Sequence, residues 1–253
     1  MRDNAFAVSL NGGAGQIGIW CNLSDPIAVE IAASAGFDWL LLDTEHAPAD
    51  PITVVHGLQA AAAHPVSVLV RPPNGDVAII KRLLDVGAQN LLIPMVESVQ
   101  QAREIAAAVA FPPHGIRGVS SQTRAGNWGR DAGYLSNARD GICVIVQIES
   151  VAGVAAIADI AAVDGVDALF VGTADLAASM GLLGQPKHPD VLAAVDTVVA
   201  AAAAAGKPIG GLTRHVEDAQ ALLDRGFAFV GVGTDTAIFA TALDSLRARF
   251  PAA

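Results

Sequence analysis

Charged side chains are scarce in this chain of 253 residues: they make up 16% of it, and 25 acidic residues outnumber 15 lysines and arginines. The basic residues are scattered, whereas a nucleic-acid interface needs them clustered on one face. We therefore expect no nucleic-acid partner. A small anionic substrate stays open, because one buried arginine is enough to bind a carboxylate.

Cysteine and long apolar runs are also lacking. Cys21 and Cys143 are the two cysteines, too few for a disulfide framework, and they suit a reducing compartment. The beginning of the chain lacks the long apolar core of a signal peptide. The most apolar run, VDTVVAAAAAAG, is too short and too rich in alanine to span a membrane. We expect a cytoplasmic protein with no membrane partner.

Short apolar runs alternate instead with alanine-rich helical segments along the whole chain. The apolar runs are continuous, which is typical of parallel strands buried on both faces. Eight such strands, each followed by a helix, predict a (β/α)₈ TIM barrel that forms a single domain over residues 1–253. The alternative is an open doubly wound sheet, but its glycine-rich phosphate loop after the first strand is absent. The expected strands cover 17–20, 38–43, 66–71, 90–95, 143–149, 166–172, 207–213 and 227–233.

The expected helices begin and end at recognisable signals. The helix 25–36 has Ser24 or Asp25 as its cap and Gly36 as its stop, and the helix 76–87 has Asp76 and Gly87. One long segment, 110–141, has no regular pattern. A loop of that length in a compact domain is usually functional. The other expected helices cover 51–64, 98–109, 151–163, 174–180, 189–205, 216–226 and 235–250.

Polar residues gather where the expected strands end. In a barrel of this kind the carboxyl ends of the strands form the catalytic face. Asp43, Glu45 and His46 follow the second strand, and Arg71 ends the third. The residues at the ends of later strands are Gln147, Glu149, Gly172, Thr173, Asp175, Leu212 and Asp235.

Each of these residues also has a purely structural interpretation. Asp43, Asp175 and Asp235 are plausible helix caps. Glu45 could be a solvated loop acid or a partner in an ion pair, Arg71 could bridge barrel carboxylates, and a lone histidine such as His46 is more often structural than catalytic. Glu149 is harder to explain in this way, because an acid at the end of the apolar run CVIVQIE needs a partner.

The functional interpretation rests on the combination. Glu149 and Asp175 follow neighbouring strands, and two hard oxygen ligands with room for water suit Mg²⁺ or Mn²⁺. No HExxH or cysteine-rich zinc pattern is present. Arg71 offers a planar fork for a carboxylate or an enolate oxygen, and His46 offers a group for proton transfer.

The three lysines strengthen this interpretation by their positions. Lys81 falls within an expected helix, Lys187 in a loop and Lys207 at the entry of a strand. None is placed to form a Schiff base at the catalytic end. A barrel that handles a carbonyl substrate without such a lysine should polarise the carbonyl with a metal ion.

Seven stretches of the sequence carry a further signal: GIWCNLSDP, AGFDWLLLDTEHAP, VRPPNGD, KRLLDVGAQNLLIPMVES, PPHGIRGV, VQIES and FVGTADLAASMG. Together they resemble the HpcH/HpaI aldolase family over about residues 16–249. The resemblance implies a class II pyruvate aldolase acting on 4-hydroxy-2-oxo acids, and 2-keto-3-deoxy sugar acid aldolases are also similar. The products would be pyruvate and an aldehyde such as succinate semialdehyde.

The resemblance also assigns roles to residues. Glu149 and Asp175 would bind a divalent ion, Mg²⁺ or Mn²⁺, with Co²⁺ a further candidate. Arg71 would contact the keto oxygen of pyruvate. His46 would be the acid/base group, with Asp43 and Asp85 supporting it. The substrate would also meet Gln147, Gly172, Thr173, Asp175 and Leu212, where Thr173 replaces the proline of the commoner GPADL motif.

Family members are typically hexamers that exchange C-terminal helices between subunits. The resemblance therefore implies a homo-hexamer in which the helix at about 235–249 packs on a neighbour. The long loop, here near Arg117 to Arg130, would reach a neighbour's site. Two other functions stay open: a CoA-ester lyase on the same barrel, although no basic entrance for CoA is visible, and a non-catalytic barrel that binds a partner.

Overall fold

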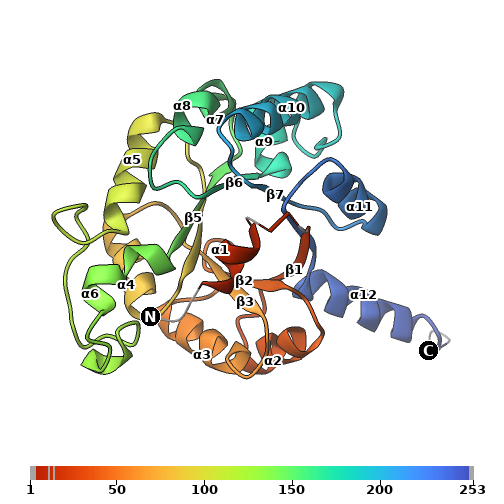
Figure 1. Cartoon of the computed structure of the whole chain (residues 1–253). Helices are drawn as coiled ribbons and strands as arrows, with labels where there is room; N and C mark the ends of the chain where they lie inside the picture. Colours follow the sequence, from red (N-terminus) through yellow and green to blue (C-terminus); the bar gives the residue numbers. More distant parts are fainter. Residues whose placement is uncertain (1–3, 11, 14, 251–253) are drawn as a thin grey trace.

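The computed structural model describes residues 4–10, 12–13 and 15–250, and its eight strands form a closed parallel barrel in sequence order. Figure 1 shows the strands around one axis with the helices outside them. The predicted (β/α)₈ architecture is confirmed. The strands are β1 (Gln16–Cys21), β2 (Trp39–Asp43), β3 (Ser67–Arg71), β4 (Asn90–Ile93), β5 (Cys143–Ile148), β6 (Ala168–Val171), β7 (Ile209–Leu212) and β8 (Phe229–Thr234).

The outer helices begin where short polar side chains cap them. The carboxylates of Asp25, Asp50 and Asp76 and the hydroxyl of Ser98 accept hydrogen bonds from backbone N–H groups in the first turns of α2, α3, α4 and α5. These helices are α2 (Pro26–Ser34), α3 (Pro51–Ala61), α4 (Val77–Asp85), α5 (Val99–Ala108), α7 (Val151–Ala155), α8 (Ile157–Ala161), α9 (Thr173–Ser179), α10 (Pro189–Ala204), α11 (Val216–Asp224) and α12 (Asp235–Arg247).

The interior of the barrel is filled by aromatic and branched side chains. Trp20 and Trp39 pack edge to face with ring centroids 5.8 Å apart, and Phe229 lies 6.0 Å from Trp39. A second apolar layer fills the space between the strands and the outer helices. The barrel is therefore a packed core and not a channel.

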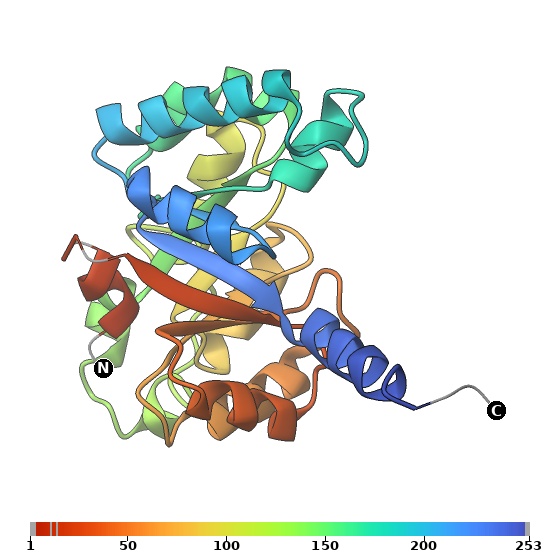
Figure 2. The same cartoon turned by 90° about the vertical axis from the view of Figure 1, so that its right-hand side faces the viewer.

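A short helix, α1 (Ala5–Leu10), closes the amino end of the barrel, and we did not predict it. Its Phe6 is fully buried, and its ring lies 5.3 Å from that of Phe229. The Asn4 side chain donates hydrogen bonds to Asn90 at 2.8 Å and to the carbonyl oxygen of Gly141 at 3.1 Å. Figure 2 places α1 at the end of the barrel opposite to α12.

Helix α12 projects away from the barrel in both views (Figures 1 and 2). None of its residues is buried, although half of a typical outer helix faces the core. Its exposed apolar side chains are Ile238, Phe239, Leu243 and Leu246. This face has no partner within the described part of the chain.

Two predicted segments differ in detail. The expected single helix over 151–163 is two short helices, α7 and α8, that meet at Ala156. The segment 110–141 contains a short helix, α6 (Tyr134–Asn137), and two 3-10 turns. It connects α5 to β5, so it lies toward the amino ends of the strands. No helix among the described residues is long and apolar enough to cross a membrane.

Candidate active site

Asp43 and Arg71 form the centre of a polar cluster at the carboxyl ends of the strands. They are the last residues of β2 and β3 and lie directly opposite each other in the parallel register. The Arg71 Nε donates to Asp43 Oδ1 at 3.0 Å, and Nη2 donates to Oδ2 at 2.7 Å. Both side chains are buried, which makes this a fork-shaped, largely dehydrated ion pair.

Glu45 lies between Arg71 and His46. Its Oε2 is 3.1 Å from Arg71 Nη1 and 3.7 Å from His46 Nε2. The side chain of Glu45 is 16% exposed, whereas that of His46 is 62% exposed. Arg71 therefore bridges two carboxylates, those of Asp43 and Glu45, as the structural alternative predicted. This bridge does not remove Arg71 from the site, because the ion pairs lie within the polar cluster.

The charge of Asp43 is held by several donors. Burial alone would raise the pKa of Asp43, but the hydrogen bonds and charge of Arg71 outweigh burial and hold the pKa below its ordinary value. The Asn22 side chain also donates to Asp43 Oδ2 at 2.9 Å. The backbone N–H of Asn22 in turn donates to Asp235 at 2.9 Å, in the first turn of α12. Neither Asp43 nor Asp235 is therefore a helix N-cap.

Glu149 follows β5 and is almost completely buried. Its Oε1 accepts a hydrogen bond from the backbone N–H of Met95 at 2.8 Å, and its Oε2 accepts one from the Gln147 side chain. Gly172 lies so close that a Cβ atom there would clash with Oε2. Burial raises the pKa of Glu149 to about 7, and the negative charges of Asp175 and Glu45 add to this effect.

Met95 adopts a backbone conformation that is rare for a residue with a side chain. Its φ is +53°, in the left-handed region, and this conformation accompanies the hydrogen bond from its N–H to Glu149. Such conformations persist where the surrounding structure enforces them, often at functional sites. No local sequence pattern indicates this strained position.

The donor set around Glu149 fits a hard divalent cation. Asp175 lies in the first turn of α9 and acts electrostatically on Glu149. Within the described ranges no group of three or more His, Cys, Asp or Glu side chains is arranged to hold a metal. An ion held by Glu149 and Asp175 would therefore take its other oxygen ligands from water or substrate, as Mg²⁺ commonly does.

The remaining predicted substrate residues lie at the same end. Gln147 is buried, and its Oε1 has no hydrogen-bond partner among the described residues, so it is free to accept one from a ligand. Gly172 and Thr173 begin α9, and no side chain caps that helix. Leu212 ends β7 and packs against the aromatic interior of the barrel.

Asp85 does not belong to this cluster within the chain. It is the last residue of α4, the helix that carries the chain from the carboxyl end of β3 back to the amino end of β4. Its carboxylate accepts a hydrogen bond from Arg117 Nη2 at 2.8 Å. Asp85 therefore does not lie beside His46 within one chain, and its support of His46 stays a prediction. The carboxylate beside His46 is that of Glu45.

The lysines are engaged elsewhere, as predicted. Lys207 Nζ donates to the carbonyl oxygen of Val166 at 2.7 Å, before β7 begins. Lys187 forms an exposed ion pair with Asp218 at 2.7 Å. Lys81 lies in α4. None of the three contacts the Arg71 cluster.

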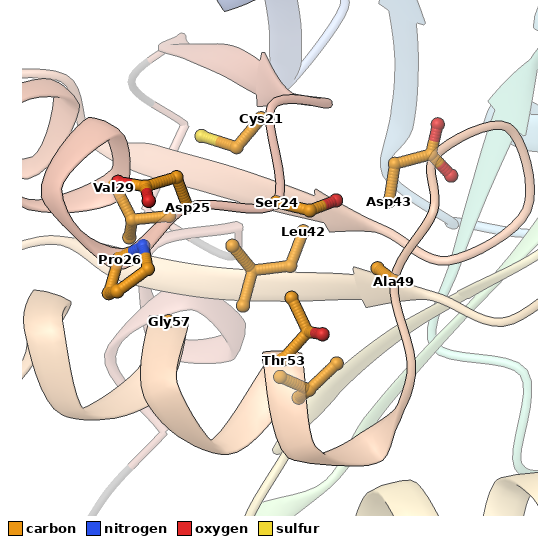
Figure 3. Close-up of a pocket in the computed structure, with 11 residues that line it drawn as sticks. Cys21, Ser24, Asp25, Pro26, Val29, Leu42, Asp43, Ala49, Thr53 and Gly57 are labelled. Atoms are coloured by element: carbon orange, nitrogen blue, oxygen red, sulfur yellow. The ribbon is translucent and has the colours of Figure 1, made fainter.

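A small hollow lies outside the barrel wall, between β1, β2, α2 and α3. Figure 3 shows its lining, with Cys21, Leu42 and Thr53 around it and Asp43 at its edge. Its volume of about 10 Å³ is room for roughly one water molecule. It is too small for an organic substrate, and of the polar cluster it touches Asp43 but not Glu45, His46, Arg71 or Glu149.

Comparisons with known proteins agree on one family. The family model of HpcH/HpaI aldolase/citrate lyase matches residues 16–242. A hydroxypyruvate/pyruvate aldolase of Pseudomonas aeruginosa is 47% identical over 98% of this chain and 92% of its own length. A 4-hydroxy-2-oxo-heptane-1,7-dioate aldolase of Salmonella dublin is 47% identical over 98% of this chain and 95% of its own. A solved HpcH/HpaI aldolase/citrate lyase family protein of Burkholderia cenocepacia is 38% identical, covers 98% of this chain and 100% of its own, and has a TM-score of 0.93.

Proposed function

The chain belongs to the HpcH/HpaI aldolase/citrate lyase family, and on that premise we propose that it cleaves 4-hydroxy-2-oxo acids to pyruvate and an aldehyde. It is a carbon–carbon lyase of the aldolase type, which excludes a non-catalytic barrel. The substrates are proposed from its relatives: 4-hydroxy-2-oxoheptanedioate would give succinate semialdehyde as the aldehyde. The relatives at 47% identity that carry aldolase names favour this reaction over a CoA-ester lyase.

One observation carries the proposal. Arg71, held by Asp43 and Glu45, lies at the same end of the barrel as the buried Glu149. Burial alone would lower the pKa of Arg71, but the carboxylates of Asp43, Glu45 and Glu149 raise it. A fixed guanidinium beside a buried carboxylate is suited to an oxyanion that develops during C–C cleavage, because preorganised charges cost no reorganisation in the transition state.

The 2-oxo acid end of the substrate would bind deepest. Gln147 offers its free Oε1, and the backbone at Gly172 and Thr173 would hold the carboxylate. Thr173 retains the backbone N–H that the proline of the commoner motif lacks. Leu212 would supply an apolar wall at the end of β7.

Glu149 and Asp175 would hold the divalent ion, Mg²⁺ or Mn²⁺ with Co²⁺ as a third candidate. When bound, the ion supplies a Lewis acid that polarises the 2-oxo acid. The burial and raised pKa of Glu149 support this placement, because a buried carboxylate without a cation is costly to ionise.

The protein side chains would then move one proton and stabilise one charge. Loss of the proton from the C4 hydroxyl breaks the C3–C4 bond and leaves pyruvate as its enolate and the other fragment as an aldehyde. Arg71 stabilises the enolate oxygen. His46, exposed at the mouth and 3.7 Å from Glu45, receives the proton and returns one to C3.

The first prediction is that the purified protein releases pyruvate from 4-hydroxy-2-oxo acids in a metal-dependent reaction. Coupling to lactate dehydrogenase measures the release over a panel that includes 4-hydroxy-2-oxoheptanedioate and 2-keto-3-deoxy sugar acids. We expect EDTA to abolish the rate and Mg²⁺, Mn²⁺ or Co²⁺ to restore it. A rate that is insensitive to EDTA would contradict the metal, and no release from any member would contradict the substrate class.

The second prediction concerns assembly. We propose a homo-hexamer in which α12 packs on a neighbouring subunit, supported by its exposed apolar side chains. Light scattering at micromolar concentration should give a mass of about six times the 25.7 kDa of one chain. Replacing Phe239 and Leu243 with aspartate should lower the mass, because two charges would then enter the apolar contact. A monomeric wild type would contradict the proposal.

The proposed location is the cytoplasm. Cys21 and Cys143 are both buried and unpaired, and burial raises the pKa of the Cys21 thiol to about 12. Such thiols are unreactive small apolar side chains, and this supports a reducing compartment.

A further inference from the structure

We propose that Glu45 is a positioning residue that holds Arg71 and His46 in one arrangement for the reaction. The inference rests on the proposed aldolase function but concerns a residue to which neither the sequence motifs nor the comparisons assigned a role. Its basis is that a single carboxylate oxygen, Glu45 Oε2, contacts both the group that would stabilise charge and the group that would move the proton.

Glu45 completes the fixation of the guanidinium. Asp43 occupies Nε and Nη2 of Arg71, so Nη1 is the corner that Asp43 leaves open. Glu45 occupies that corner at 3.1 Å. The guanidinium is thereby fixed on two sides, with the Trp20 ring 5.6 Å from its Cζ. A substrate oxygen that approaches Nη1 must share it with Glu45 or displace Glu45.

His46 depends on Glu45 for its orientation. Its imidazole is largely exposed, and its Nε2 lies 3.7 Å from the carboxylate of Glu45. An exposed side chain on a loop has several rotamers available, and holding one of them costs conformational entropy. A contact with a fixed carboxylate restricts the ring to positions near Arg71. Misplacement of a reacting group by about 1 Å can cost on the order of a hundredfold in rate.

The loop that carries Glu45 is itself tied to the ion pair. The backbone N–H groups of Glu45 and His46 donate to Asp43 Oδ1 at 3.0 and 3.4 Å. The backbone N–H and the hydroxyl of Thr44 donate to the carbonyl oxygen of Arg71 at 2.9 and 2.7 Å. Loss of the Glu45 carboxylate would therefore leave the loop backbone in place, so that its effect reports on positioning and not on folding.

The test compares Glu45→Gln and Glu45→Ala with Glu97→Gln, which removes a charge from an exposed glutamate in the β4–α5 loop at the same end of the barrel. We expect Glu45→Ala to lower kcat by about a hundredfold, with a smaller change in KM and an unchanged melting temperature. Glu45→Gln keeps an acceptor oxygen for Arg71 and should lower kcat less. A kcat for Glu45→Ala equal to that of Glu97→Gln, or a loss of stability with kcat retained, would overturn the proposal.

A second measurement needs no catalysis. Diethyl pyrocarbonate modifies accessible histidine nitrogens, and peptide mass spectrometry follows each site, with His114 and His215 as references in the same digest. We expect Glu45→Ala to raise the modification rate of His46 alone, because the side chain that lies 3.7 Å from Nε2 is then removed. An unchanged rate at His46 would overturn the contact. A wild type that releases no pyruvate would instead refute the proposed function, and the modification rates would still decide the role of Glu45.

Discussion

Replacing His46 with alanine is expected to slow pyruvate release by roughly a hundred- to ten-thousandfold, the usual contribution of a general acid/base. The same variant should slow the exchange of pyruvate methyl protons with solvent, because both reactions move a proton at C3. NMR in deuterated buffer measures the exchange, and the coupled assay measures the release. Metal affinity should change little, since Glu149 and Asp175 are the proposed ligands.

A matched control for this variant is His215→Ala. His215 is also exposed at the carboxyl end of the barrel, where it precedes α11 without capping it through its side chain. It should retain both activities. Loss of metal binding in His46→Ala would make His46 a ligand, and wild-type rates of both reactions would show that the proton moves by another route.

The second large effect is expected at the metal ligands. Glu149→Gln and Asp175→Asn keep the shape of each side chain and remove its charge, and hard divalent ions prefer anionic oxygen. Half-saturating metal concentration should rise by more than about tenfold, since even residues that only orient a ligand contribute roughly 10- to 100-fold to metal affinity. Titration of pyruvate release against free Mn²⁺ measures this, and high Mn²⁺ should rescue part of the rate.

The alternative is that these carboxylates are only structural. That interpretation predicts a lower melting temperature with unchanged dependence on metal. Asp218→Asn is a suitable control, because it removes a carboxylate that pairs with Lys187 on the surface and should leave the titration unchanged. Equal half-saturation for the wild type and both ligand variants would show that Glu149 and Asp175 do not bind the metal.

The sequence contained enough to predict the barrel and most of the cluster. Continuous apolar runs indicated buried parallel strands, and strands in sequence order bring residues at their carboxyl ends together. This is why Asp43 and Arg71, separated by 28 positions, could be assigned to one site and are found opposite each other. The predicted caps were Ser24 or Asp25 for one helix and Asp76 for another, and Asp25 and Asp76 accept hydrogen bonds from their helices.

Other features depend on contacts that no local pattern encodes. Helix α1 has only six residues, and what stabilises it is the packing of Phe6 inside the barrel. The ion pair of Asp85 with Arg117 joins a helix end to a distant irregular segment. The position of Glu45 between Arg71 and His46 follows from how the loop folds back on Asp43. The sequence signal for it was that Asp43, Glu45 and His46 are close neighbours in the stretch DTEHAP.

The closure of the amino end by α1 has a kinetic consequence. With Phe6 inserted there and aromatic rings filling the interior, no molecule can pass through the barrel, and the site opens at its carboxyl end. Everything that enters at the carboxyl mouth must leave by the same way. In the proposed cleavage, pyruvate is the inner fragment and the aldehyde the outer one. In that proposed arrangement the aldehyde would leave first and pyruvate second, and in the direction of synthesis pyruvate would bind before the aldehyde.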